Sequence, residues 1–147
     1  MREILQNDEG SVVVIVALAM SVLLGVAALV IDVGVLYYNR VALANAADAA
    51  ALAGVQELPG DPLRAEAVAV SYASRNGVEE SRASAVVEPD GCSIRVTTSR
   101  TVPLGFARIF GVTSSEVGAS ARARVGVAKS ARGVAPFGVV QQEFVYG

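Results

Sequence analysis

Residues 11–31, SVVVIVALAMSVLLGVAALVI, decide the fold of this chain. The stretch contains no charged residue and no proline. As a helix, its 21 residues rise about 30 Å, which matches the hydrocarbon core of a bilayer. A helix inside a soluble protein of this size is rarely apolar on every face over such a length. The stretch therefore predicts a transmembrane helix near the amino terminus.

A cleaved secretory signal is the alternative interpretation of this segment. The apolar part of a signal normally covers about 7–15 residues, which is shorter than the stretch here. Small residues at Ala42, Ala44 and Ala46 provide potential cleavage sites, so the alternative stays open. For a membrane span, we expect residues 1–10 to form a cytoplasmic leader, because more than a hundred residues follow the span. The bulk of the chain is then extracytoplasmic.

Polar and aromatic residues follow the apolar stretch closely. Asp32 comes first, and Tyr37, Tyr38 and Arg40 follow it. The tyrosines are typical of an interfacial belt, which would place Asp32 about 9 Å below Tyr38, at the edge of the hydrocarbon. A carboxylate at that depth needs a partner and hints at a function. In the other interpretation, the membrane ends at Asp32 and the tyrosines lie outside it.

The helix is expected to continue well beyond the membrane. No proline occurs before residue 59, and residues 41–55 are VALANAADAAALAGV. Because alanine is the best helix former, one unbroken helix from about Ser11 to Gln56 is predicted, ended by Pro59 and Gly60. Side chains this small let another backbone, from a sheet or from a neighbouring subunit, approach closely.

Two polar residues interrupt the alanine-rich segment. Asn45 and Asp48 are three residues apart and share a face of the helix. They could hydrogen-bond a partner strand or subunit and fix its register, or they could form a solvated stripe. Together with Asp32 and Gly34, they are the candidate residues for helix packing or register.

The second half of the chain predicts a small mixed domain. Asp61 and Pro62 are typical of a helix start, and Asn76 with Gly77 of its end. Two alternating runs, joined by Pro89-Asp90-Gly91, predict a β-hairpin, and residues 115–129 predict a third strand. Between them, residues 103–111 read as a short helical turn whose two phenylalanines we expect to close one end of the core.

The predicted fold class is therefore α+β. A long amino-terminal transmembrane helix continues into a small, pilin-like head with a roughly three-stranded antiparallel sheet and short helices. We expect the sheet to lie on the outer, alanine-rich half of the helix. The predicted segments are a leader (1–10), the long helix (11–58), an extracytoplasmic α/β domain (59–130), and a linker or truncated continuation (131–147).

Composition narrows the function. The 147 residues include no histidine and one cysteine, with a net charge of −2. These values exclude a histidine-based metal site or triad and an intramolecular disulfide, and they argue against a nucleic-acid surface. The acidic pairs Glu79-Glu80 and Glu88/Asp90 lie beside turns and read as solvated loops. We therefore expect a non-enzymatic protein without cofactor or metal.

Residues 8–58 carry a resemblance to a known family. The stretches are DEGS at 8–11, IDVG at 31–34, Tyr37, Arg40 and LANAADAAALAG at 43–54. This segment resembles the amino terminus of the Flp pilus-assembly TadE/TadG-like family. The later run F-x-x-I-F-G at 106–111 is similar to the downstream sequence of many members. The resemblance implies a bacterial or archaeal single-pass envelope protein of the tight-adherence apparatus, similar to pilins in plan.

The chain also departs from related patterns. Pilins that a prepilin peptidase cuts carry Gly before the cut and Glu five residues after it. Gly10 and Ser11 are the candidate leader-processing residues, but the fifth residue is Ile15. The Asp-x-Ser-x-Ser metal motif of some TadG-like members does not occur.

These observations lead to one functional prediction and one alternative. The prediction is a membrane-anchored assembly or minor subunit of a Tad/Flp-type pilus or secretion apparatus. Its partners would be membrane lipid and other pilus or secretion subunits, with no nucleic acid, and the alanine-rich helix could also pair with a second copy of the chain. The alternative is an extracellular filament subunit, with residues 11–38 in the filament core.

Overall fold

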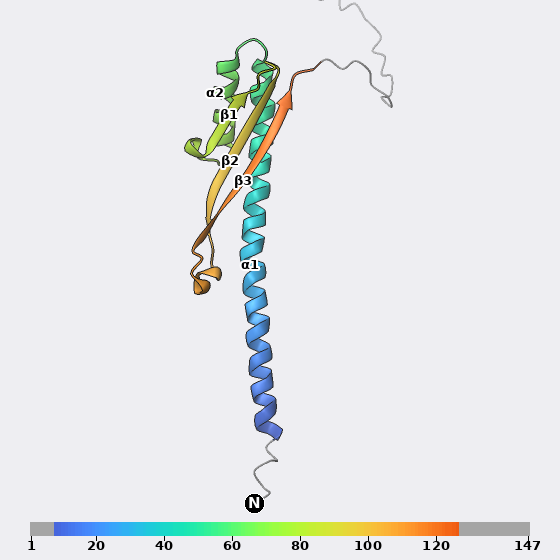
Figure 1. Ribbon diagram of the computed structural model, residues 1–147, viewed down its shortest axis with the longest axis vertical. Helices are drawn as coiled ribbons and strands as arrows, with labels where there is room; N and C mark the ends of the chain where they lie inside the picture. Colours follow the sequence, from blue (N-terminus) through green and yellow to red (C-terminus); the bar gives the residue numbers. More distant parts are fainter. Residues whose placement is uncertain (1–7, 127–147) are drawn as a thin grey trace, which may run out of the picture.

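One helix dominates the computed structural model, which describes residues 8–126 (Figure 1). This helix, α1, runs without a break over Asp8–Gly54, and the 3₁₀ turn η1 (Val55–Glu57) follows it. Its 47 residues rise about 70 Å. The prediction of a single helix that passes from the apolar stretch into the alanine-rich segment and ends before Pro59 is confirmed.

The second helix, α2 (Pro62–Arg75), is capped as its sequence predicts. The Asp61 carboxylate accepts a hydrogen bond from the Arg64 amide at 3.0 Å, and Pro62 occupies the first helical position. Gly77, with a φ of +82°, takes the left-handed conformation after the helix. The 3₁₀ turn η2 (Glu80–Arg82) then leads into the sheet.

Three antiparallel strands form the sheet, in the order β1 (Ala83–Val87), β2 (Ser93–Pro103) and β3 (Ser114–Arg124). The register places Ala85 and Ala121 opposite Val96 from its two sides. The connection from β2 to β3 contains the 3₁₀ turn η3 (Ala107–Phe110), which ends at Gly111. Predicted strand residues 127–129 lie outside the described residues, as do residues 1–7 of the leader and the whole tail, 131–147.

The sheet covers only the upper half of α1, and α1 and α2 lie behind it on the same face (Figure 1). α1 packs against β2 and β3, and α2 packs against β1. The core between them is built mainly of small side chains: Ala46, Ala50 and Ala51 from α1, Ala65, Ala69 and Ala73 from α2, and Ile94 and Val96 from β2. This arrangement confirms the α+β fold and the position of the sheet on the alanine-rich half.

Gly54 marks the closest approach in this core. A Cβ atom there would lie 2.7 Å from the Ala65 carbonyl oxygen and 2.9 Å from both the Ala69 Cβ and an Ile94 methyl. These distances are too short for any side chain, so the contact between α1 and α2 depends on glycine at this position. The small residues thus serve close packing within the chain, as the alanine-rich segment predicts.

One expectation about the core was wrong. The phenylalanines of the β2–β3 connection do not close the end of the core, because the side chains of Phe106 and Phe110 are 43% and 86% exposed. The strands β2 and β3 extend past the core, so η3 at their far end lies beside the lower half of α1 (Figure 1).

Candidate functional site

The lower half of α1, residues 12–31, is bare: almost none of it is covered by the rest of the described chain. Every residue from Val12 to Ile31 is exposed except Ala28, which is half-buried. The helix is long and apolar enough to cross a membrane, by length and composition. Such a surface in water would be an unusually large apolar patch, which marks an interaction site with lipid or protein.

Asp32 lies at the junction of the bare and covered halves, and it is buried. Its two carboxylate oxygens accept hydrogen bonds from three consecutive backbone amides of the β2–β3 connection. The donor–acceptor distances are 2.9 Å for Gly105, 3.0 Å for Phe106 and 2.7 Å for Ala107. Amides at the start of a helical turn carry partial positive charge and suit an anion. The buried carboxylate is therefore compensated by three backbone donors.

Two further polar links lie above Asp32 on the same face of α1. Asn39 accepts a hydrogen bond from the Arg100 guanidinium at 3.0 Å. The Thr98 hydroxyl donates to the Leu43 carbonyl at 3.1 Å, and both residues are fully buried. Because positions 32, 39 and 43 are spaced by about two and one helical turns, they form one line along the helix. This line fixes the height of the sheet relative to α1.

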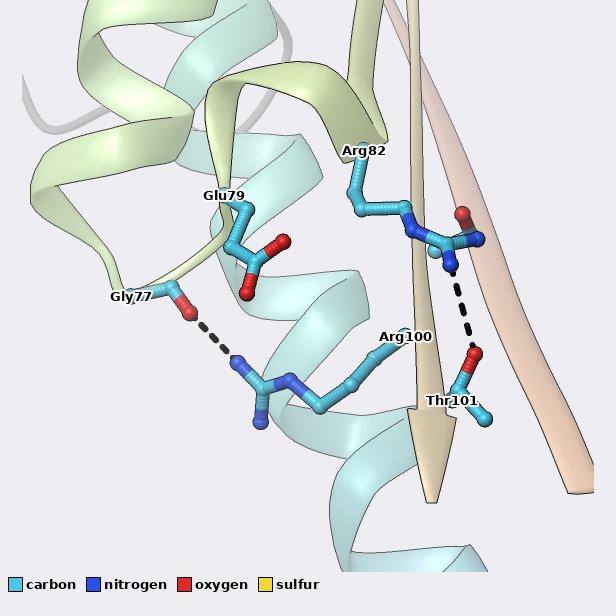
Figure 2. A pocket seen from close by; sticks show the side chains of 6 residues that line it. Gly77, Glu79, Arg82, Arg100 and Thr101 are labelled. Carbon is cyan, nitrogen blue, oxygen red and sulfur yellow. Dashed lines mark hydrogen bonds between the residues drawn. The ribbon is translucent and has the colours of Figure 1, made fainter. Parts of the chain in front are cut away.

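Arg100 also reaches a polar pocket on the edge of the head (Figure 2). Its guanidinium donates to the Gly77 carbonyl, and Arg82 from η2 donates to Thr101 at 3.4 Å and lies 3.3 Å from Glu116. Glu79 lines the same pocket. Arg100 thus ties β2 to α1 and to the end of α2, and Arg82 ties η2 to β2 and β3. Their observed partners are structural, and no nucleophile with an adjacent base is among the lining residues.

The remaining sequence-predicted residues lie on the other side of α1. Gly34, Asn45 and Asp48 are exposed and face away from the sheet. A Cβ at Gly34 would meet no atom of the described residues within 4 Å. Asn45 and Asp48 make no side-chain hydrogen bond within residues 8–126, so they do not fix the register of the chain's own sheet. Their contact with another subunit stays a prediction.

The candidate residues for the membrane interface and for leader processing stay predictions as well. Tyr37 and Tyr38 are 70% and 72% exposed, and Arg40 is also exposed. Gly10 and Ser11 lie in the first turn of α1. Tyr37 and Tyr38 follow the end of the apolar stretch by less than two helical turns, a spacing consistent with headgroup depth.

The acidic pair Glu88 and Asp90 is held by contacts within the head. Glu88 lies 2.7 Å from Arg95 and 3.2 Å from Arg122. Hydrogen bonds from the Ser93 hydroxyl, at 2.7 Å, and from the Cys92 amide hold the pKa of Asp90 below its usual range. Within residues 8–126, no group of three or more His, Cys, Asp or Glu side chains is placed to hold a metal ion.

The partners of Asp32 were the part of the site that the sequence did not reveal. Every residue except proline has a backbone amide, so no side-chain pattern identifies those of 105–107. Gly105 is not a signal either, because a Cβ there would lie 3.4 Å from the Asp32 carboxylate, which is an ordinary contact distance.

The comparison with protein families bears on the same helix. Residues 10–57 match the family described as putative Flp pilus-assembly TadE/G-like. The match spans the bare half of α1, Asp32 and the alanine-rich half, and it supports a pilus-related role. The description is one of assembly and not of catalysis, and it suggests contacts with other pilus subunits. Comparisons with curated proteins and with solved structures gave no significant match.

Proposed function

We propose that this chain is a membrane-anchored assembly or minor subunit of a Tad/Flp-type pilus or secretion apparatus. The observation that carries the proposal is the coincidence of the TadE/G-like match, at residues 10–57, with a helix whose lower half is apolar on every face and bare. Such a surface needs lipid or other apolar helices around it. The leader is then cytoplasmic and the head extracytoplasmic.

In this function the chain acts through contacts. The line of links at Asp32, Asn39 and Leu43 makes the head and the upper helix one unit, so the head is held at a constant height above the anchor. The opposite face of α1 carries Gly34, Asn45 and Asp48 and is open to a neighbour. Glycine within a helix destabilises it by about 1 kcal/mol relative to alanine. Nothing in the described chain crowds Gly34, so a closely packed neighbour is a reason for its presence.

Fractionation of native cells tests where the protein acts. We expect it in the membrane fraction, with its leader intact, and absent from sheared appendages. Mass spectrometry of the native amino terminus accompanies the fractionation. Recovery in sheared filaments, with a chain that starts at Ser11, would replace this proposal with the filament subunit whose core holds residues 11–38.

Crosslinking tests the outward face of α1. A photo-reactive residue at Asn45 or Asp48 should capture a neighbouring subunit in cells that express the whole apparatus. The mass of the product distinguishes a second copy of this chain from another subunit. Ser84, exposed on the far face of the sheet, is the matched control position. Capture from Ser84 with none from Asn45 or Asp48 would assign the contact to the sheet instead.

A further inference from the structure

The connection between β2 and β3, residues 104–113, presents an apolar tip to the surroundings. Its exposed large side chains are Phe106, Ile109, Phe110 and Val112, with exposed fractions of 43%, 81%, 86% and 48%. Arg108 is the only charged residue among these ten. A cluster of bulky apolar side chains at the end of a loop is a binding surface and not a feature of a solvated turn.

The position of this tip identifies what surrounds it. Phe106, Ile109 and Phe110 line one side of an apolar groove, and Val22, Val26 and Leu29 of α1 line the other. In Figure 1, η3 lies below the sheet, beside the bare half of the helix. Val22 is ten residues before Asp32, which is about 15 Å along the axis. The tip therefore lies beside a part of α1 that belongs to the predicted membrane span.

Most backbone amides of the connection have a partner within the protein, which suits a hydrocarbon environment. In lipid, each peptide group needs a partner within the protein. Three amides donate to Asp32. Four more donate within the connection: Leu104 to Thr113, Ile109 to Phe106, Gly111 to Arg108 and Val112 to Ala107. Seven amides of this short segment are thus paired without water.

We propose that residues 104–113 insert into the outer leaflet of the bilayer as a second, re-entrant membrane contact. Phe106, Ile109 and Phe110 would contact lipid acyl chains beside α1, and Arg108 would extend toward lipid phosphate groups. Asp32 then lies within the membrane, with Tyr37 and Tyr38 at headgroup depth. The inference rests on the proposed membrane anchoring and adds that the head itself is embedded.

Tryptophan fluorescence in lipid nanodiscs tests the insertion. The chain contains no tryptophan, so Phe110→Trp introduces a single reporter at an exposed site. We expect blue-shifted emission and strong quenching by lipids brominated on their acyl chains. Ile109→Trp provides a second reporter on the same tip, in case the first variant does not fold. Emission at the wavelength of a solvated indole, without quenching by the brominated lipids, overturns the proposal.

Two control positions separate this proposal from the anchoring on which it rests. Val16→Trp, in the bare half, should be quenched if α1 spans the bilayer. Leu63→Trp, 81% exposed on α2, should remain red-shifted and unquenched. Quenching at Val16 without quenching at Phe110 rejects the inserted loop and retains the anchor. Blue-shifted emission at Phe110 that brominated lipid does not quench identifies a protein neighbour, which also rejects the proposal.

Discussion

The two halves of α1 solve the problem of burying apolar surface in opposite ways. The upper half uses alanine and glycine, and its own sheet and second helix cover it. The lower half uses valine, leucine and isoleucine, and nothing in the described chain covers it except the tip of one loop. Most of the large apolar side chains of α1 are therefore left for an outside partner, and α1 contributes mainly small ones to the protein's own core. Hydrophobicity alone would have assigned the core to the wrong half.

Charged substitutions in the two halves of α1 should give the largest difference between them. The double exchange Met20→Arg with Leu24→Arg puts two cations in the lower half, each of which opposes insertion by about 3 kcal/mol. We expect the protein to leave the carbonate-resistant membrane fraction. The matched control, Val41→Arg with Leu52→Arg, places the same charges on exposed sites of the upper half and should keep the protein in the membrane. Equal retention of both double variants would contradict the division.

Glycine to alanine exchanges compare the packing of the two halves. Gly54→Ala forces a methyl group against Ala65, Ala69 and Ile94, so we expect the head to lose up to about 3 kcal/mol of unfolding free energy. Gly25→Ala meets no atom of the described chain within 4 Å and should leave that free energy unchanged. Urea unfolding in detergent micelles measures both. A stable Gly54→Ala variant would mean that α1 and α2 separate more easily than their contacts indicate.

Asp32 lies at the boundary between the two halves of α1, and replacing its carboxylate tests the contact made there. Asp32→Asn removes the charge and replaces one acceptor oxygen with an amide that repels the donors of 105–107. Hydrogen exchange at those three amides should become faster, and the head should unfold at a lower urea concentration. Asp48→Asn, an exposed control on the same helix, should change the unfolding free energy by less than about 0.5 kcal/mol. Unchanged exchange at 105–107 would show that the Asp32 contact is dispensable.

Acid should affect the head and spare the anchor, and this is the smallest effect expected. The Ser93 hydroxyl, with the Cys92 amide, lowers the pKa of Asp90 below its ordinary value of 3.8. Because its pKa is lowered, the ionised Asp90 contributes in full to the free energy of unfolding above about pH 4. This contribution is lost as the pH falls through the pKa that Asp90 has in the folded protein. Urea unfolding from pH 6 to 3 measures it, and Ser93→Ala should flatten the profile. Residues 12–31 contain no titratable side chain, so membrane retention should not follow it.

Local patterns predicted most of the elements. Asp61 and Pro62 identified the start of α2, Gly77 its end, and the alternation around Asp90 the hairpin, because each depends on neighbouring residues only. Whether the Asp32 carboxylate finds hydrogen-bond donors depends instead on residues 73 to 75 positions away in the sequence. Whether they reach it is set by strand length. An 11-residue strand spans about 36 Å, which is close to the rise of α1 from Asp32 to Gly54.

The same logic explains the misplaced phenylalanines. The two phenylalanines in a short turn indicated an apolar surface, and that was correct. They did not indicate what the surface faces, because a turn at the end of two long strands can lie far from the core. Asn45 and Asp48 were likewise identified as a polar face of α1 from their spacing. That spacing does not identify what the face contacts.

β2 and α1 lie side by side and run in opposite directions, and this arrangement has a mechanical consequence. The links of α1 to β2 at Asn39 and Leu43, and to the β2–β3 connection at Asp32, lie one after another along the direction of any force that acts between the head and the lower half of α1. Such a load shears all three at once and does not peel them open one by one. If α1 is anchored in a membrane as proposed, tension on the head would pass directly to α1 without first separating it from the sheet.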